Sequence, residues 1–103
     1  MSRPDEIQGV THKIKTACGN AYVTVNKLEG KIHEIFAILG KSGGCGKGTM
    51  EGSGRLASLA IRSGASPDKI VKSLKGIGCS NSTPEIHSCH NALAIIIEKS
   101  VTE

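Results

Sequence analysis

The apolar residues of this chain change their spacing at the glycine-rich stretch 40–49, which reads GKSGGCGKGT. Before this stretch apolar and polar residues alternate, loosely in residues 10–15 and clearly in 21–25, and residues 31–39 form another apolar-rich segment. After it the apolar residues recur at intervals of about 3.6 positions. A period of two is typical of strands and the longer period is typical of helices. The chain therefore divides into a strand half followed by a helical half.

Turn and capping residues mark the expected bounds of the helices. Residues 26–30 carry turn chemistry, so the strands 21–25 and 31–39 are expected to form a hairpin. A first helix is expected from near Thr49 to Ser63. Ser66 and Pro67 are the N-cap and first residue of a second helix ending at Gly76, and Thr83 and Pro84 begin a third that runs to about Val101.

These elements predict an α+β fold class, a three-stranded antiparallel sheet followed by three helices. The 103 residues suit a single domain, expected at 10–103 after a flexible N-terminal segment 1–9. Aromatic residues make up only 2% of the chain, so the core must be built from Ile, Leu, Val and Ala. A core of this size often benefits from a metal that cross-links it.

Charge and hydropathy exclude some classes of partner. The net charge of +4 is mild, and the basic residues are scattered without aromatic partners for base stacking, so nucleic acid is not an expected partner. No apolar stretch is long enough to span a membrane, and the N-terminus MSRPDEIQGV has no signal-peptide core. We therefore expect a cytoplasmic protein whose four cysteines are reduced.

The glycine-rich stretch does not fit a nucleotide loop. A phosphate-binding loop requires the order G-x-x-x-x-G-K-[ST]. Gly40 has Ile35 five positions before it, and Gly46-Lys47 is followed by Gly48 instead of Ser or Thr. Both registers fail, so this stretch is not expected to bind nucleotide phosphates.

The four cysteines have similar surroundings. Cys18 precedes Gly19, Cys45 lies between two glycines and Cys79 follows Gly78, whereas Cys89 falls in the third predicted helix. There is no C-x-x-C pair. Cysteines beside glycines can approach a common ion without crowding of the backbone, and four thiolates around Zn²⁺ form a closed, structural site. The alternative interpretation is that the four cysteines serve as small buried apolar residues.

Two histidines are candidates for further ligands. His87 and His90 are three positions apart and are expected on one face of the third helix, as additional metal ligands or as hydrogen-bonding neighbours of the ligands. His12 and His33 fall in predicted strands and are expected at the surface.

Four segments in order resemble the TSCPD domain family over roughly residues 10–98. They are TACGNAYVTVN at 16–26, LGKSGGC at 39–45, GRLASLAIRSG at 54–64 and IVKSLKGIGC at 70–79. That domain is found towards the C-terminus of vitamin B12-dependent ribonucleotide reductases and in small stand-alone four-cysteine proteins. Where the family has Thr-Ser-Cys-Pro-Asp, this chain has His87-Ser88-Cys89-His90-Asn91. The resemblance implies a metal role for the cysteines, but it implies no role for the missing Asp.

The resemblance implies a function without catalysis by this chain alone. We expect a zinc-binding module that acts in docking or regulation beside a ribonucleotide reductase catalytic chain, in deoxynucleotide synthesis. The expected zinc ligands are Cys18, Cys45, Cys79 and Cys89. A homo-oligomer is kept as an alternative state of assembly.

A second, more distant resemblance is to the NifU/IscU-type iron–sulfur scaffolds. Cys18, Cys45 and Cys89 match the three cysteine positions of those scaffolds, and Asn20 stands where they carry an Asp ligand. The alternative function is therefore an iron–sulfur cluster scaffold or carrier that uses the same cysteines, with Asn20 beside them. The amide at that position and the extra thiolate of Cys79 favour static zinc over a cluster that must be released.

Overall fold

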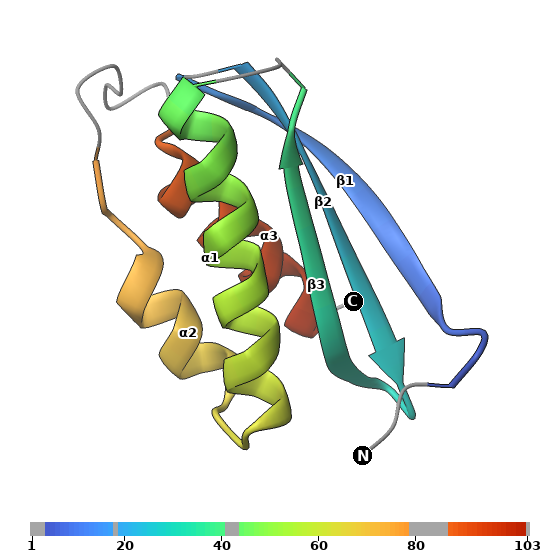
Figure 1. Ribbon diagram of the computed structural model, residues 1–103. Coiled ribbons are helices and arrows are strands. Elements are labelled where there is room, and N and C mark those ends of the chain that lie inside the picture. Colours follow the sequence, from blue (N-terminus) through green and yellow to red (C-terminus); the bar gives the residue numbers. More distant parts are fainter. Residues whose placement is uncertain (1–3, 18, 41–43, 79–86, 103) are drawn as a thin grey trace.

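The computed structural model describes residues 4–17, 19–40, 44–78 and 87–102. Three antiparallel strands form one sheet in the order β1-β2-β3, and three helices follow them in the chain (Figure 1). The predicted α+β fold class is confirmed. The elements are β1 Gln8–Thr16, β2 Gly19–Leu28, β3 Lys31–Leu39, α1 Gly44–Arg62, α2 Pro67–Leu74 and α3 Cys89–Thr102.

The sheet is a meander whose register places its buried apolar residues on one face. Val25 pairs with Val10 on β1 and with Ile35 on β3, and Val23 pairs with Ala37. Glu29 and Gly30 both have positive φ, 55° and 79°, and connect β2 to β3. A two-residue turn of this kind matches the twist of the strands it joins, so the predicted hairpin is confirmed.

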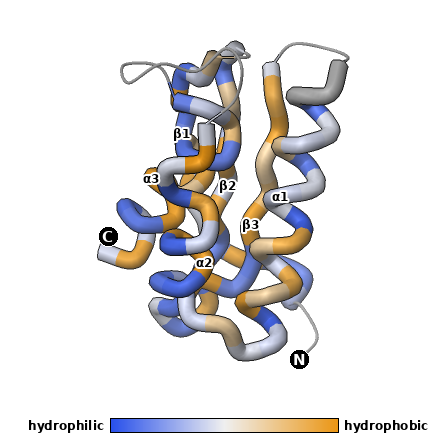
Figure 2. The backbone as a smooth tube through the Cα atoms, turned by 90° about the vertical axis from the view of Figure 1, so that its left-hand side faces the viewer, coloured by the Kyte–Doolittle hydropathy of each residue, from blue (hydrophilic) through white to orange (hydrophobic). Residues whose placement is uncertain are grey.

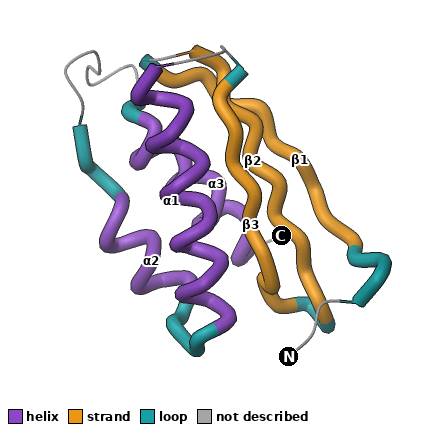
Figure 3. The backbone as a smooth tube through the Cα atoms, viewed as in Figure 1, coloured by secondary structure: helices purple, strands orange, loops and turns teal. Residues whose placement is uncertain are grey.

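Helix α1 packs along the free edge of β3 (Figure 3). The Oγ of Ser58 accepts a hydrogen bond from the N–H of Ile35 at 2.6 Å and donates one to its carbonyl at 2.7 Å. One turn earlier, a Cβ on Gly54 would lie 3.0 Å from the Cβ of Ala37. An unpaired strand edge invites pairing with another chain. Here α1 covers that edge and satisfies its backbone groups at Ile35.

The core lies between the sheet and the helices. Its members include Ile35, Met50, Leu93 and Ile97, each no more than 1% exposed. Figure 2 shows the long hydrophobic stretch of β3 beside α1. Helix α3 contacts all three strands, and α2 packs mainly on α3. Within the part of the chain that the structure describes, no helix is long and apolar enough to cross a membrane.

Several predicted bounds differ from the structure. Strand β1 begins at Gln8, inside the segment predicted to be flexible, and α1 begins at Gly44, five residues before the predicted Thr49. Met50 is fully buried. Packing of this turn therefore overrides the poor helix propensity of the glycines around it. The capping prediction for α2 is confirmed, because the Ser66 side chain accepts a hydrogen bond from the N–H of Lys69.

The third helix begins later than predicted. The proposed start at Thr83 and Pro84 lies outside the described residues. The prediction that His87 lies in this helix is wrong, because His87 forms a parallel bridge with Thr16 at the end of β1. Helix α3 starts at Cys89, with Ser88 as its cap. His33 was also placed wrongly, since it is only 8% exposed.

Candidate metal centre

The segment before α3 is bound to the end of β1. The backbone N–H of Ala17 donates to the carbonyl of His87 at 2.9 Å, beside the bridge between Thr16 and His87. This places the start of α3 next to the β1–β2 connection, where Cys18 falls in the sequence.

Cys89 is the first residue of α3 and is 5% exposed. Its Sγ lies 4.0 Å from the hydroxyl oxygen of Thr16. The same hydroxyl donates to the carbonyl of Gly19 at 2.8 Å. The Thr16 side chain therefore connects the Cys89 thiol to backbone on both sides of Cys18. Sequence reasoning missed Thr16, and only the pairing of distant segments reveals it.

The end of β3 and the start of α1 reach the same end of the molecule. The N–H of Gly40 donates to the carbonyl of Asn20 at 2.7 Å, which holds the end of β3 against the start of β2. Helix α1 begins four residues later at Gly44, with Cys45 as its second residue. In Figure 1 this first turn of α1 lies at the same end as the β1–β2 connection.

The segment after α2 is tied to the start of α3. The Oγ of Ser88 accepts from the N–H of Asn91 at 3.1 Å and donates to the carbonyl of Ile77. The Asn91 side-chain oxygen accepts from the N–H of Gly76 at 3.0 Å. Residues 76 and 77, which directly precede Gly78-Cys79, are thereby attached next to Cys89. Ser88 is a preferred N-cap residue, and this signal would have located the helix start.

The two histidines of this segment have different surroundings. The ring of His87 is half-buried, and its Nδ1 lies 2.9 Å from the side-chain nitrogen of Asn91. That amide is oriented by its bond to Gly76, so its NH₂ donates and Nδ1 of His87 accepts. The role of His87, as an additional ligand or as a hydrogen-bonding neighbour of the ligands, stays a prediction.

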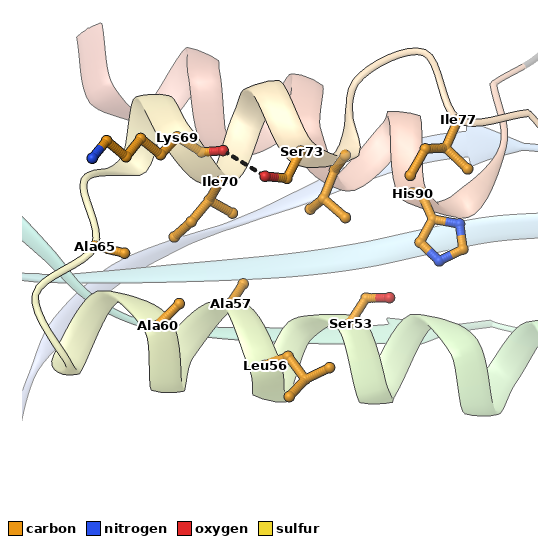
Figure 4. Close-up of a pocket in the computed structure, with 11 residues that line it drawn as sticks. Ser53, Leu56, Ala57, Ala60, Ala65, Lys69, Ile70, Ser73, Ile77 and His90 are labelled. Carbon is orange, nitrogen blue, oxygen red and sulfur yellow. Dashed lines mark hydrogen bonds between the residues drawn. The ribbon is translucent and has the colours of Figure 1, made fainter.

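His90 and Asn20 have different surroundings. The His90 ring lines a groove between α1 and α2 (Figure 4). Asn20 is exposed, beside Lys15 and Tyr22.

The four predicted ligands are described to different extents. Cys89 is described in full and Cys45 by its position in α1, whereas Cys18 and Cys79 lie outside the described residues. Among the described residues there is no group of three or more His, Cys, Asp or Glu side chains that could hold a metal ion. The four-cysteine site therefore stays a prediction. In the described part of the chain, residues near Cys18 and Cys79 are hydrogen-bonded to the start of α3 at Cys89, and the first turn of α1 lies at the same end of the molecule (Figure 1).

Comparison with known proteins identifies one family. The model of the TSCPD domain matches residues 2–101, nearly the whole chain. No curated protein and no solved structure matches the chain. Because this match covers nearly the whole chain, the chain belongs to the TSCPD domain family.

Proposed function

We propose that this chain is a zinc-binding, non-catalytic module that acts with a ribonucleotide reductase in deoxynucleotide synthesis, by docking or regulation. TSCPD domains are associated with ribonucleotide reductase. Reductase chemistry needs a large barrel, a radical source and a substrate pocket, which are more than 103 residues can provide. The chain is therefore proposed to support a catalytic chain instead of replacing it.

One observation carries the zinc part of this proposal. The backbone on either side of Cys18, the first turn of α1 with Cys45, the segment before Cys79 and the buried thiol of Cys89 all belong to one end of the domain. Four sulfur donors suit Zn²⁺ in a closed tetrahedral site. When bound, zinc would supply a structural cross-link between segments that are joined, in the described part of the chain, by a few hydrogen bonds.

Two of the proposed ligands lie at helix N-termini. Cys45 is the second residue of α1 and Cys89 is the first residue of α3. The unpaired N–H groups and the dipole at a helix N-terminus favour negative charge, which a ligating thiolate carries. Four thiolates persist only where disulfides do not form, so we place the protein in the cytoplasm.

Metal analysis tests the zinc proposal. We expect protein purified without added metal to be colourless and to contain a single zinc ion per chain. We also expect its thiols to react with a thiol reagent only after addition of a chelator. Brown protein with visible absorption after anaerobic purification would instead establish the iron–sulfur scaffold. Metal-free protein whose four thiols react before a chelator is added would refute both the zinc hypothesis and the iron–sulfur hypothesis.

The reductase part needs a separate experiment. A purified vitamin B12-dependent reductase catalytic chain should form a complex with this chain in sedimentation, or change its rate of deoxynucleotide formation when this chain is added. The matched control is Ser73→Ala, an exposed substitution on α2. If this chain at tens of micromolar neither forms a complex nor changes the rate of deoxynucleotide formation, the reductase role is refuted and the zinc result is unaffected.

A further inference from the structure

Both aromatic residues of the chain lie on the face of the sheet that points away from the core. Helix α3 packs on the opposite face and α1 along the edge of β3 (Figure 1). The chain has one Tyr, one Phe and no Trp. Aromatic side chains usually dominate a core because they bury a large apolar area, yet Phe36 is 53% exposed and Tyr22 is half-buried. We call this surface the outer face, and the residues of it that carry the argument are Lys13, Lys15, Tyr22, Thr24, Phe36 and Ile38.

The strand register places the two rings next to each other. Tyr22 of β2 pairs with Ile38 of β3. Two positions further along β2, Thr24 pairs with Phe36. Tyr22 and Phe36 are therefore diagonal neighbours on adjacent strands, which places them about 7–8 Å apart. Ile38 is 51% exposed and the Thr24 hydroxyl lies on an exposed surface, so the two rings are open to solvent.

A depression at one end of the outer face contains the Tyr22 ring. It has a volume of about 350 Å³ and is lined by Lys15, Gly19, Asn20, Tyr22 and Gly40. A Cβ on Gly40 would lie 3.2 Å from the Cε2 of Tyr22, so a side chain there would crowd the ring. The depression combines an aromatic ring with the side-chain amide of Asn20 and the ammonium group of Lys15. These groups suit a base that stacks on the ring, a base edge that hydrogen-bonds to the amide, and a phosphate.

The exposed charges of the outer face are positive. Lys13 pairs with Tyr22, and both Lys13 and Lys15 are exposed. The carboxylate of this face in the described strands, Glu34, is 3% exposed and accepts a hydrogen bond from the Asn26 side chain at 2.8 Å. A two-fold contact between copies would set this face against itself, and its described strands offer no exposed carboxylate to the two lysines. The face is instead complementary to phosphate groups.

We propose that the outer face binds single-stranded nucleic acid. Bases stack on the rings of Tyr22 and Phe36, and the ammonium groups of Lys13 and Lys15 contact phosphates of the same strand. A single strand fits better than a duplex, because paired and stacked bases do not present a free face to a ring. The sequence predicted no nucleic-acid partner because its basic residues are scattered, but the register gathers two of them beside both rings. This proposal needs neither the metal nor the reductase of the proposed function.

Fluorescence anisotropy of a labelled single strand of about 12 nucleotides tests the proposal with the full chain. The matched control is an abasic strand of the same length, which keeps the phosphates and lacks the bases. We expect the abasic strand to bind at least about fivefold more weakly, the factor that corresponds to weak stacking of a single base. The chain has one Tyr and no Trp, so tyrosine emission reports on Tyr22 alone, and the base-bearing strand should quench it. Thymidine and uridine strands are compared, and tighter binding of either supports the proposal and identifies the strand as DNA or RNA.

Substitutions separate stacking from attraction by charge. Tyr22→Ala and Phe36→Ala should each weaken binding at least about fivefold. Leu56→Ala, at a side chain of α1 that is 68% exposed, should leave binding unchanged. Lys13→Gln with Lys15→Gln should reduce the slope of log affinity against log salt by about 1.4, since each phosphate contact of a single strand contributes about 0.7. Circular dichroism checks folding, and the exposed position of Phe36 keeps the test valid if Tyr22→Ala does not fold.

Five results would overturn the proposal. No binding at about 100 µM protein would exclude even non-specific affinity. Equal affinity for the base-bearing and abasic strands would leave only charge, and unchanged binding by both alanine variants would place the site elsewhere. A mononucleotide that displaces the strand at the strand's own dissociation constant would make a single nucleotide the ligand. A dimer in sedimentation that Phe36→Ala disrupts would make a second copy the occupant. Each outcome can be read whether or not the protein binds zinc or a reductase.

Discussion

Replacement of Ser58 by alanine tests how α1 holds the edge of the sheet. The hydroxyl of Ser58 is the partner of both the N–H and the carbonyl of Ile35, at 2.6 and 2.7 Å. Ser58 is 6% exposed and Ile35 is 1% exposed, so water does not replace a lost partner at this contact. The substitution Ser58→Ala leaves two buried backbone groups without hydrogen bonds.

The magnitude follows from these two groups. An unsatisfied buried polar group costs about 1–3 kcal/mol, and the better helix propensity of alanine returns about 0.5 kcal/mol. With about 2 kcal/mol for each of the two groups and about 0.5 kcal/mol returned, we expect Ser58→Ala to lower the free energy of unfolding by about 3.5 kcal/mol. In a domain of this size each kcal/mol shifts the melting temperature by about 4–8 °C, so the melting temperature should fall by about 14–28 °C.

Thermal and urea unfolding followed by circular dichroism measure this loss. Ser73→Ala is the matched control, because the Ser73 hydroxyl also donates to a backbone carbonyl, that of Lys69 at 2.9 Å, but on an exposed surface. Its melting temperature should stay within a few degrees of the parent. Hydrogen exchange at the Ile35 amide should accelerate in Ser58→Ala. Equal melting of the two variants, with unchanged Ile35 exchange, would refute the reasoning.

Three further substitutions are expected to change the stability of the protein by measurable amounts. Gly52→Ala should raise the free energy of unfolding by about 1 kcal/mol, because an added methyl group would contact nothing within 4 Å. Gly54→Ala should lack that gain, because its Cβ would lie 3.0 Å from the Cβ of Ala37 on β3. The midpoints of urea unfolding compare the two variants. Asn26→Ala removes a 2.8 Å hydrogen bond to the buried carboxyl of Glu34 and should cost about 1.5–3 kcal/mol in the same assay; a loss below 0.5 kcal/mol, the usual effect of a surface substitution, would contradict it. Cys45→Ser should lower zinc content and the melting temperature together, since metal binding contributes to folding; unchanged melting would count against a structural metal.

The sequence predicted the strand and helix content through local signals. The alternation of Val23 and Val25, the turn chemistry at 26–30 and the Ser66-Pro67 cap each act over a few residues, and each is confirmed. The misplaced bounds have a different origin. The start of α1 at Gly44 depends on packing of Met50.

The candidate site could be predicted only in part. Cysteines beside glycines and at the start of a helix predicted a set of zinc ligands, and that set stays a prediction. The pairing of Thr16 with His87, 71 positions later, could not be predicted, because hydrogen bonds between distant segments leave no periodic signal. The burial of His33 and the position of His90 in the groove were also decided by packing.

By itself the sequence determined the α+β class, the order of the elements and the family, since these follow from periodicity, caps and ordered motifs. Only the tertiary structure decided that α1 covers the β3 edge through Ser58 and that the α1–α2 groove stays open. It also decided that Cys89 lies beside the β1–β2 connection. These features depend on contacts between residues far apart in the chain. Their energies come from burial and from partners that no local pattern records.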